Sequence, residues 1–218
     1  MLPVPADRLV VFLAASAALV LTPGPDTLYV LVRGASRGRA VGVAAGAGVA
    51  TGVLVHTTLV ALGLAALVRS SRAAFEFVAL LGAAYLVLLG GSMLRSALHG
   101  GSLDAGIGAS AGETSGGTAT LPAAYARGVA VDVLNPKVVV FFVAFLPGFA
   151  GSGPGTTGRL LFLGGCYAAL TLAYLGMVGL AAGRVGALFG RHPRLERGLD
   201  AVAGVVLVAL GVGLVLGG

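Results

Sequence analysis

Two proline motifs lie inside long apolar segments of this chain. The first runs from Thr22 to Asp26 (Thr-Pro-Gly-Pro-Asp), and the second from Asn135 to Lys137 (Asn-Pro-Lys). Proline has no backbone N–H, so it deprives the carbonyl four residues earlier of its helical donor. A bilayer core has no water to replace that donor, and such breaks persist there only against protein or a wet cavity. Two breaks, one in each half of a chain, are typical of the substrate site of a secondary transporter.

The composition places these motifs in a membrane. Apolar residues make up 57% of the 218 residues and charged residues 10%, and the mean hydropathy is +1.01. Such values are typical of a polytopic membrane protein, with the lipid bilayer as its environment. Stretches long enough to span a bilayer predict six transmembrane helices: Leu9–Val32, Ala40–Val68, Phe75–Leu94, Ala123–Phe149, Leu160–Ala182 and Leu199–Leu216.

Residues 100–120 are rich in Gly, Ser, Ala and Thr, which predicts a flexible linker. It separates a first three-helix unit, residues 1–99, from a second, residues 121–218. An odd number of spans per unit places the two units in opposite orientation. The predicted fold is therefore an all-α membrane protein with six helices in two inverted units, whose first and fourth helices are broken at the proline motifs.

The net charge of +6 reflects loop arginines rather than a nucleic-acid surface, because no basic face or nucleic-acid motif accompanies it. On one side of the predicted topology the loops carry four arginines, and on the other nine. Cytoplasmic loops carry the excess of basic residues, so both termini are predicted to lie outside. The four are Arg8, Arg69, Arg72 and Arg159; the nine are Arg33, Arg37, Arg39, Arg95, Arg127, Arg184, Arg191, Arg194 and Arg197.

The first motif offers a cap and a carboxylate. Thr22 can cap the helix that restarts after the break, and Asp26 falls in its first turn, at the positive end of the helix dipole. A carboxylate there can bind a substrate ammonium or relay a proton. The alternative is that Asp26 is a helix-capping residue buried in protein.

The second motif places Lys137 inside a predicted span, where a lysine costs at least about 2.5 kcal/mol at the helix centre. Either Asp26 or Asp132 pairs with it, so that it can bind a substrate carboxylate, or its side chain extends to the cytoplasmic interface. Asp132 lies either inside the membrane or at the interface. His56 is mid-span, where it is either a hydrogen-bonded core residue or a proton carrier. The candidates for proton coupling are Asp26, Asp132 and His56.

Other chemistries have little support in the sequence. Cys166 is the only cysteine, which argues against a membrane thiol–disulfide carrier. No cluster of metal ligands and no nucleophile–base pair is visible, so neither a metal, a cofactor nor a catalytic residue is expected. Glycines at four-residue spacing in the second span predict close helix packing, with a homodimer seam as the alternative.

Six segments of the chain share their sequence pattern with one protein family: Leu21–Asp26, Arg37–Arg39, Gly52–His56, Gly82–Leu86, Leu89–Gly90 and Asn135–Pro147. In these segments the chain resembles the LysE/RhtB amino-acid exporter family. Two positions depart from its pattern: Asp26 stands where Asn is frequent, and Gly148 where Gln is frequent.

The resemblance implies a bacterial inner-membrane protein that exports amino acids or close derivatives, of the homoserine, threonine, leucine or lysine type, driven by the proton gradient. A cadmium-like cation exporter is the alternative. The residues expected to bind the substrate are Thr22, Pro23, Gly24, Pro25, Asp26, Asn135, Pro136 and Lys137.

Overall fold

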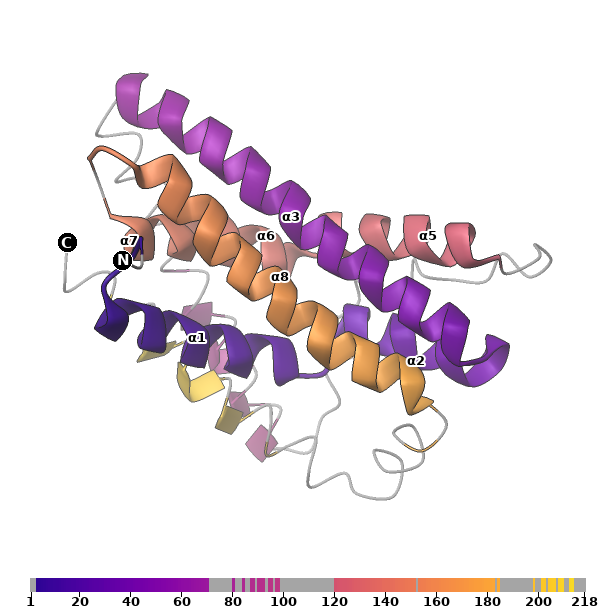
Figure 1. Cartoon of the computed structure of the whole chain (residues 1–218). Coiled ribbons are helices and arrows are strands. Elements are labelled where there is room, and N and C mark those ends of the chain that lie inside the picture. Colours follow the sequence, from indigo (N-terminus) through magenta and orange to yellow (C-terminus); the bar gives the residue numbers. More distant parts are fainter. Residues whose placement is uncertain are drawn as a thin grey trace.

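The computed structural model describes residues 3–70, 120–151 and 153–182, together with Arg184 and scattered positions between 80 and 98 and between 198 and 213. Throughout these residues the only regular structure is helical (Figure 1). The elements are α1 (Ala6–Leu21), α2 (Pro25–Arg37), α3 (Arg39–Ser70), α5 (Leu121–Val133), α6 (Pro136–Val140), the π-helix η2 (Phe141–Phe145), α7 (Leu146–Ala150) and α8 (Thr156–Leu180).

The first predicted span is broken where its prolines stand. α1 ends at Leu21, and α2 begins at Pro25 with its axis turned by 52°. Proline suits the first position of a helix because no intrahelical acceptor is available for an N–H there. Gly24 precedes it in an extended conformation as the N-cap residue. The break therefore follows directly from the local sequence.

The fourth predicted span is broken in the same way. α5 ends at Val133, and the chain turns by 55° before it continues through α6, η2 and α7. Asn135 is the N-cap of α6, and its Oδ1 accepts a hydrogen bond of 3.1 Å from the backbone N–H of Lys137. The wider π-turn that follows, Phe141–Phe145, was not predicted. Such segments are rare and often lie near functional sites.

Two unbroken helices, α3 and α8, pack along each other in opposite directions through the middle of the bundle (Figure 1). Glycines set their close approach. Gly42 lies against Gly179, Gly46 lies against Leu175, and Gly164 lies against Thr57. Small residues let helices approach closely where lipid provides no hydrophobic driving force. α5 packs against α3 in the same way, through Gly48 and Gly128.

The described residues support part of the predicted topology. Two helical segments, Arg39–Gly63 and Thr156–Leu180, are long and apolar enough to cross a membrane, and the two bent pairs bring the number to as many as four. Large apolar side chains are exposed on them, among them Leu28, Leu59, Leu62 and Met177, as expected for surfaces that face lipid. The predicted spans Phe75–Leu94 and Leu199–Leu216, and the linker, lie outside the continuously described residues.

The buried apolar side chains of the described residues form two clusters. One contains the aromatic rings of Phe12, Phe141, Phe142 and Tyr167, together with residues of α7 and α8. The other is smaller and contains residues of α2, α3, α5 and α8, including Tyr29 and Val30.

Replacing Gly179 with alanine should destabilise the fold. A Cβ there would lie 2.6 Å from the backbone carbonyl carbon of Gly42 and 2.8 Å from the backbone nitrogen of Val43. Because backbone atoms cannot rotate away as a side chain can, α3 and α8 would have to move apart. Overpacking of this kind costs about 1–3 kcal/mol. The melting temperature of the purified protein measures the effect. Gly176→Ala is the matched control on the same helix, because a Cβ at Gly176 meets nothing within 4 Å. Equal melting temperatures for both variants would contradict this packing.

Candidate functional site

The two helix breaks meet at a small cavity inside the bundle. Its volume is about 20 Å³, well below the roughly 300–1,000 Å³ of typical ligand pockets, so a ligand could enter it only if the helices separated. The cavity draws side chains from both proline motifs and from α8. It is lined by Leu19, Val20, Thr22, Gly24, Asp26, Thr27, Asp132, Lys137, Val138, Tyr167, Thr171 and Leu175.

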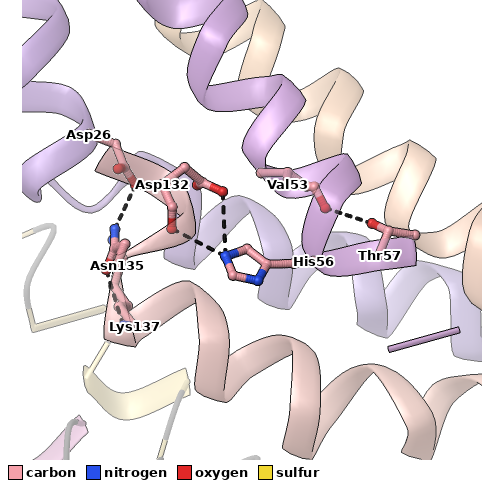
Figure 2. Close-up of polar contacts among 7 residues, drawn as sticks. All are labelled: Asp26, Val53, His56, Thr57, Asp132, Asn135 and Lys137. Atoms are coloured by element: carbon pink, nitrogen blue, oxygen red, sulfur yellow. Dashed lines mark hydrogen bonds and ion pairs between the residues drawn. The ribbon is translucent and has the colours of Figure 1, made fainter. Parts of the chain in front are cut away.

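Asp26 and Asn135 join the two motifs directly. The side-chain amide of Asn135 donates a hydrogen bond of 2.8 Å to Oδ2 of Asp26 (Figure 2). The other carboxylate oxygen of Asp26, Oδ1, is inaccessible and has no hydrogen-bond partner among the described residues. Asp26 is in the first turn of α2, as predicted. Asn135 therefore does two things: it caps α6 through Oδ1 and holds the Asp26 carboxylate through its amide.

Lys137 satisfies the carbonyl that the first break leaves without a donor. Pro23 cannot donate to the carbonyl of Leu19, four residues earlier, and Nζ of Lys137 donates to that oxygen at 3.3 Å. The ammonium also lies beside Gly24, where a Cβ would stand 3.2 Å from Nζ. Its charge acts on both Asp26 and Asp132. The side chain of Lys137 thus lines the cavity between the motifs.

His56 contacts the backbone at the second break. Pro136 cannot donate to the carbonyl of Asp132, and Nε2 of His56 lies 3.2 Å from that carbonyl oxygen (Figure 2). A carbonyl oxygen can only accept, so Nε2 carries a proton in this contact. The same nitrogen lies 3.8 Å from Oδ2 of Asp132. The Asp132 carbonyl also accepts a hydrogen bond of 2.9 Å from the backbone N–H of Asn135, so, unlike the Leu19 carbonyl, it does not depend on a side chain for its donor.

Asp132 lies inside the bundle rather than at its surface. Its exposed fraction is 0%, and both carboxyl oxygens lack a hydrogen-bond partner among the described residues. Gly52 of α3 makes room for it, because a Cβ there would lie 2.7 Å from the Asp132 side chain. A buried ionised carboxylate without hydrogen bonds is costly, so Asp132 is stabilised by binding either a proton or a cation.

The predicted capping role of Thr22 is wrong. α2 begins at Pro25, so its N-cap is Gly24, and no side chain caps that helix. Thr22 lies two residues too early. Its hydroxyl instead donates a hydrogen bond of 2.7 Å to the carbonyl of Ala18, at the end of α1. Thr22 still lines the cavity.

The predicted residues do not all reach the cavity. Pro23, Pro25 and Asn135 do not line it, although Asn135 is bonded to the lining residue Asp26. His56 does not line it either, but contacts the lining residue Asp132. The sequence reading missed three polar residues that do line it: Thr27, Tyr167 and Thr171. Within the described part of the chain, no group of three or more His, Cys, Asp or Glu residues could hold a metal ion.

Comparison with known proteins identifies the family of this chain. The family model described as LysE type translocator matches residues 17–218. An uncharacterized membrane protein of Pseudomonas aeruginosa is 32% identical over 197 residues, which cover 90% of this chain and 89% of that protein. A leucine efflux protein of Klebsiella pneumoniae is 31% identical over 70% of this chain and 68% of its own length. A leucine efflux protein of Salmonella choleraesuis is 28% identical over 90% of this chain and 89% of its own.

No solved structure matches the chain. The family match covers almost its whole length, including both proline motifs and the α8 segment that completes the cavity. The chain therefore belongs to the family of LysE type translocators.

Proposed function

We propose that this protein exports a neutral or basic amino acid, or a close derivative, from the cytoplasm of a bacterium. The observation that carries the proposal is the charge pattern of one membrane cavity: the carboxylates of Asp26 and Asp132 and the ammonium of Lys137 line it together. A free amino acid carries one cation and one anion a few ångströms apart. Such a zwitterion meets an opposite charge at each end, and the net buried charge stays small.

In this proposal the substrate ammonium binds at Asp26 and the substrate carboxylate at Lys137. The half-helix N-termini of α2 and α6 face the same region, and their positive dipole ends favour an anionic group. Acidic amino acids are poor substrates, because Asp26 opposes a second carboxylate. The leucine efflux relatives support a neutral aliphatic substrate.

We further propose that export is coupled to proton entry. With Asp26 and Asp132 ionised and Lys137 protonated, the cavity carries two negative charges and one positive charge, so a single bound proton neutralises it. Asp132 is the best carrier, because both of its carboxyl oxygens are buried without hydrogen-bond partners among the described residues. The proton and the substrate ammonium then compete for the same two carboxylates, so that binding of one favours release of the other.

The inverted arrangement of two three-helix units remains part of the proposal. The opposite directions of α3 and α8, the second helices of the two proposed units, support it. We also propose that both termini face outward. Arg33, Arg37 and Arg39 lie where α2 meets α3, at the end of the bundle that the richer set of arginines marks as cytoplasmic.

Fusions of a phosphatase reporter, which is active only outside the cytoplasm, test this orientation. A fusion at Gly218 should be active, and a fusion within residues 100–120 should be inactive. The reverse pattern would overturn the assignment of the two sides.

The exporter proposal itself is tested in cells loaded with dipeptides, in which peptidases release amino acids faster than they are used. Cells that produce this protein should release leucine, or another neutral or basic amino acid of the panel, faster than cells with an empty vector. Cadmium resistance is measured in the same strains to test the cation-exporter alternative. Equal release of every amino acid of the panel from both strains would contradict the amino-acid proposal.

A further inference from the structure

Thr171 of α8 has a buried hydroxyl without a hydrogen-bond partner among the described residues, as does Ser16 of α1, but only Thr171 of these two lines the cavity. Thr57 and Thr58 donate to the carbonyl four residues earlier, at 2.8 Å in both cases. Ser36, Thr22 and Thr51 do the same. The Thr171 side chain lies in a regular helix with the carbonyl of Tyr167 four residues before it. Nevertheless its Oγ1 has no hydrogen-bond partner among the described residues, although Thr171 is only 4% exposed.

The two other threonines of the cavity show the contrast. Thr22 is bonded to Ala18, and the side chain of Thr27 shares a hydrogen bond with Tyr174. Leaving a buried hydroxyl without a partner destabilises a protein. An unpartnered buried group needs an explanation, and for one that lines a cavity a bound ligand that supplies the missing bond is such an explanation.

The cavity contains several oxygens that can accept a hydrogen bond and that have no hydrogen-bond partner among the described residues. Thr171 Oγ1, Asp26 Oδ1 and the carboxyl oxygens of Asp132 all lack partners in the part of the chain described, and all three residues line the same cavity. They come from three different elements, α8, α2 and α5. Two of the residues present acceptors only, and a hydroxyl can accept as well as donate. A ligand group between them must therefore be rich in donors.

We propose that Thr171 is a specificity-determining residue that completes a three-acceptor site for the primary ammonium of the substrate. A primary ammonium has three N–H donors, one each for Thr171, Asp26 and Asp132. This inference rests on the proposed function and names the chemistry that the site selects, an unsubstituted amino group. An N-methyl amino acid has one donor fewer and added bulk, and an N-acyl amino acid has no cation at all.

The role predicts an unusual combination of effects for Thr171→Val. Valine has nearly the same shape but no hydroxyl, so the ligand-free protein loses an unsatisfied polar group and should melt at the same temperature or higher. The ligand complex loses a hydrogen bond to a charged group, which weakens leucine binding roughly tenfold to a hundredfold. The preference for leucine over N-methylleucine should shrink at the same time.

The experiment measures binding of leucine and N-methylleucine to the purified full-length protein, together with its melting temperature. Thr171→Ser keeps the hydroxyl and should bind leucine within a few-fold of the wild type. Thr57→Val is the matched control, because Thr57 is 2% exposed and its hydroxyl is bonded within its own helix (Figure 2). Its leucine affinity should equal that of the wild type.

The outcomes separate this inference from the proposed function. If the wild type binds leucine and Thr171→Val has the same affinity and the same discrimination, Thr171 has no role and the exporter proposal stands. A melting temperature for Thr171→Val well below that of Thr57→Val would show a packing role and would also overturn the inference. If the wild-type protein binds no amino acid of the panel, the proposed function fails together with the role of Thr171.

Discussion

Replacing Lys137 with alanine should reduce the yield of folded protein and abolish export. The substitution removes the ammonium that donates to the Leu19 carbonyl and whose charge acts on Asp26 and Asp132. Two carboxyl groups then remain in the interior without that cation, and breaking a buried ionic arrangement on one side costs about 3–5 kcal/mol. The yield of monodisperse protein and leucine release from dipeptide-loaded cells measure the two effects.

Adding Asp26→Asn to Lys137→Ala separates the effect on folding from the effect on export. Lys137→Ala combined with Asp26→Asn removes one positive and one negative charge together, so the double variant should fold better than Lys137→Ala alone. Its export should not recover, because neither end of the zwitterion then meets its opposite charge. If Lys137→Ala alone matches the wild type in both yield and transport, the ammonium is not part of the site and the alternative, extension to the interface, is correct.

Replacing Asp132 with asparagine should uncouple transport from the proton gradient without unfolding the protein. The amide has almost the same shape as the carboxyl group, and it removes a charge at a position with 0% exposure. Its N–H₂ can also donate to acceptors that a carboxylate repels. Folded yield should therefore equal or exceed that of the wild type, while stimulation of export by an imposed pH gradient falls at least about tenfold, the effect of losing about 1.4 kcal/mol of coupling.

Proteoliposomes provide the measurement, as leucine flux with and without a pH gradient across the membrane. Downhill flux without a gradient should persist in Asp132→Asn, since Asp26 and Lys137 remain. Asp7→Asn is the control for the loss of a carboxylate, because Asp7 is exposed in the first turn of α1. If Asp132→Asn responds to the pH gradient as strongly as the wild type, another group carries the proton.

The parts of the site that sequence reasoning could find are those fixed by local chemistry. A proline inside an apolar run dictates a break and a stranded carbonyl, so both breaks and the position of Asp26 in its first turn were predictable. The prediction that Thr22 caps α2 was wrong by two residues. Either proline of Pro-Gly-Pro can begin a helix, and only the folded structure shows that Pro25 does.

The features that sequence reasoning missed depend on contacts between distant segments. Asp132 is buried because Gly52, 80 residues earlier, leaves room for it, and nothing adjacent to Asp132 in the sequence signals this. Thr171 is one of several threonines in apolar helices, and it differs from Thr57 in two properties of the folded chain: it lines the cavity, and its hydroxyl has no partner among the described residues. The contacts of Lys137 with the Leu19 carbonyl and of His56 with the Asp132 carbonyl could not be predicted either, since the partners lie 118 and 76 residues apart in the sequence.

The central claim is that the junction of the two helix breaks binds and carries an amino acid, with Asp26 as a direct ligand. Counterflow in proteoliposomes tests it most directly: vesicles are loaded with unlabelled leucine, and the uptake of radiolabelled leucine is followed for the wild type and for Asp26→Ala. The account predicts rapid uptake by the wild type and uptake at the level of protein-free vesicles for folded Asp26→Ala. Counterflow by Asp26→Ala at the wild-type rate would contradict it.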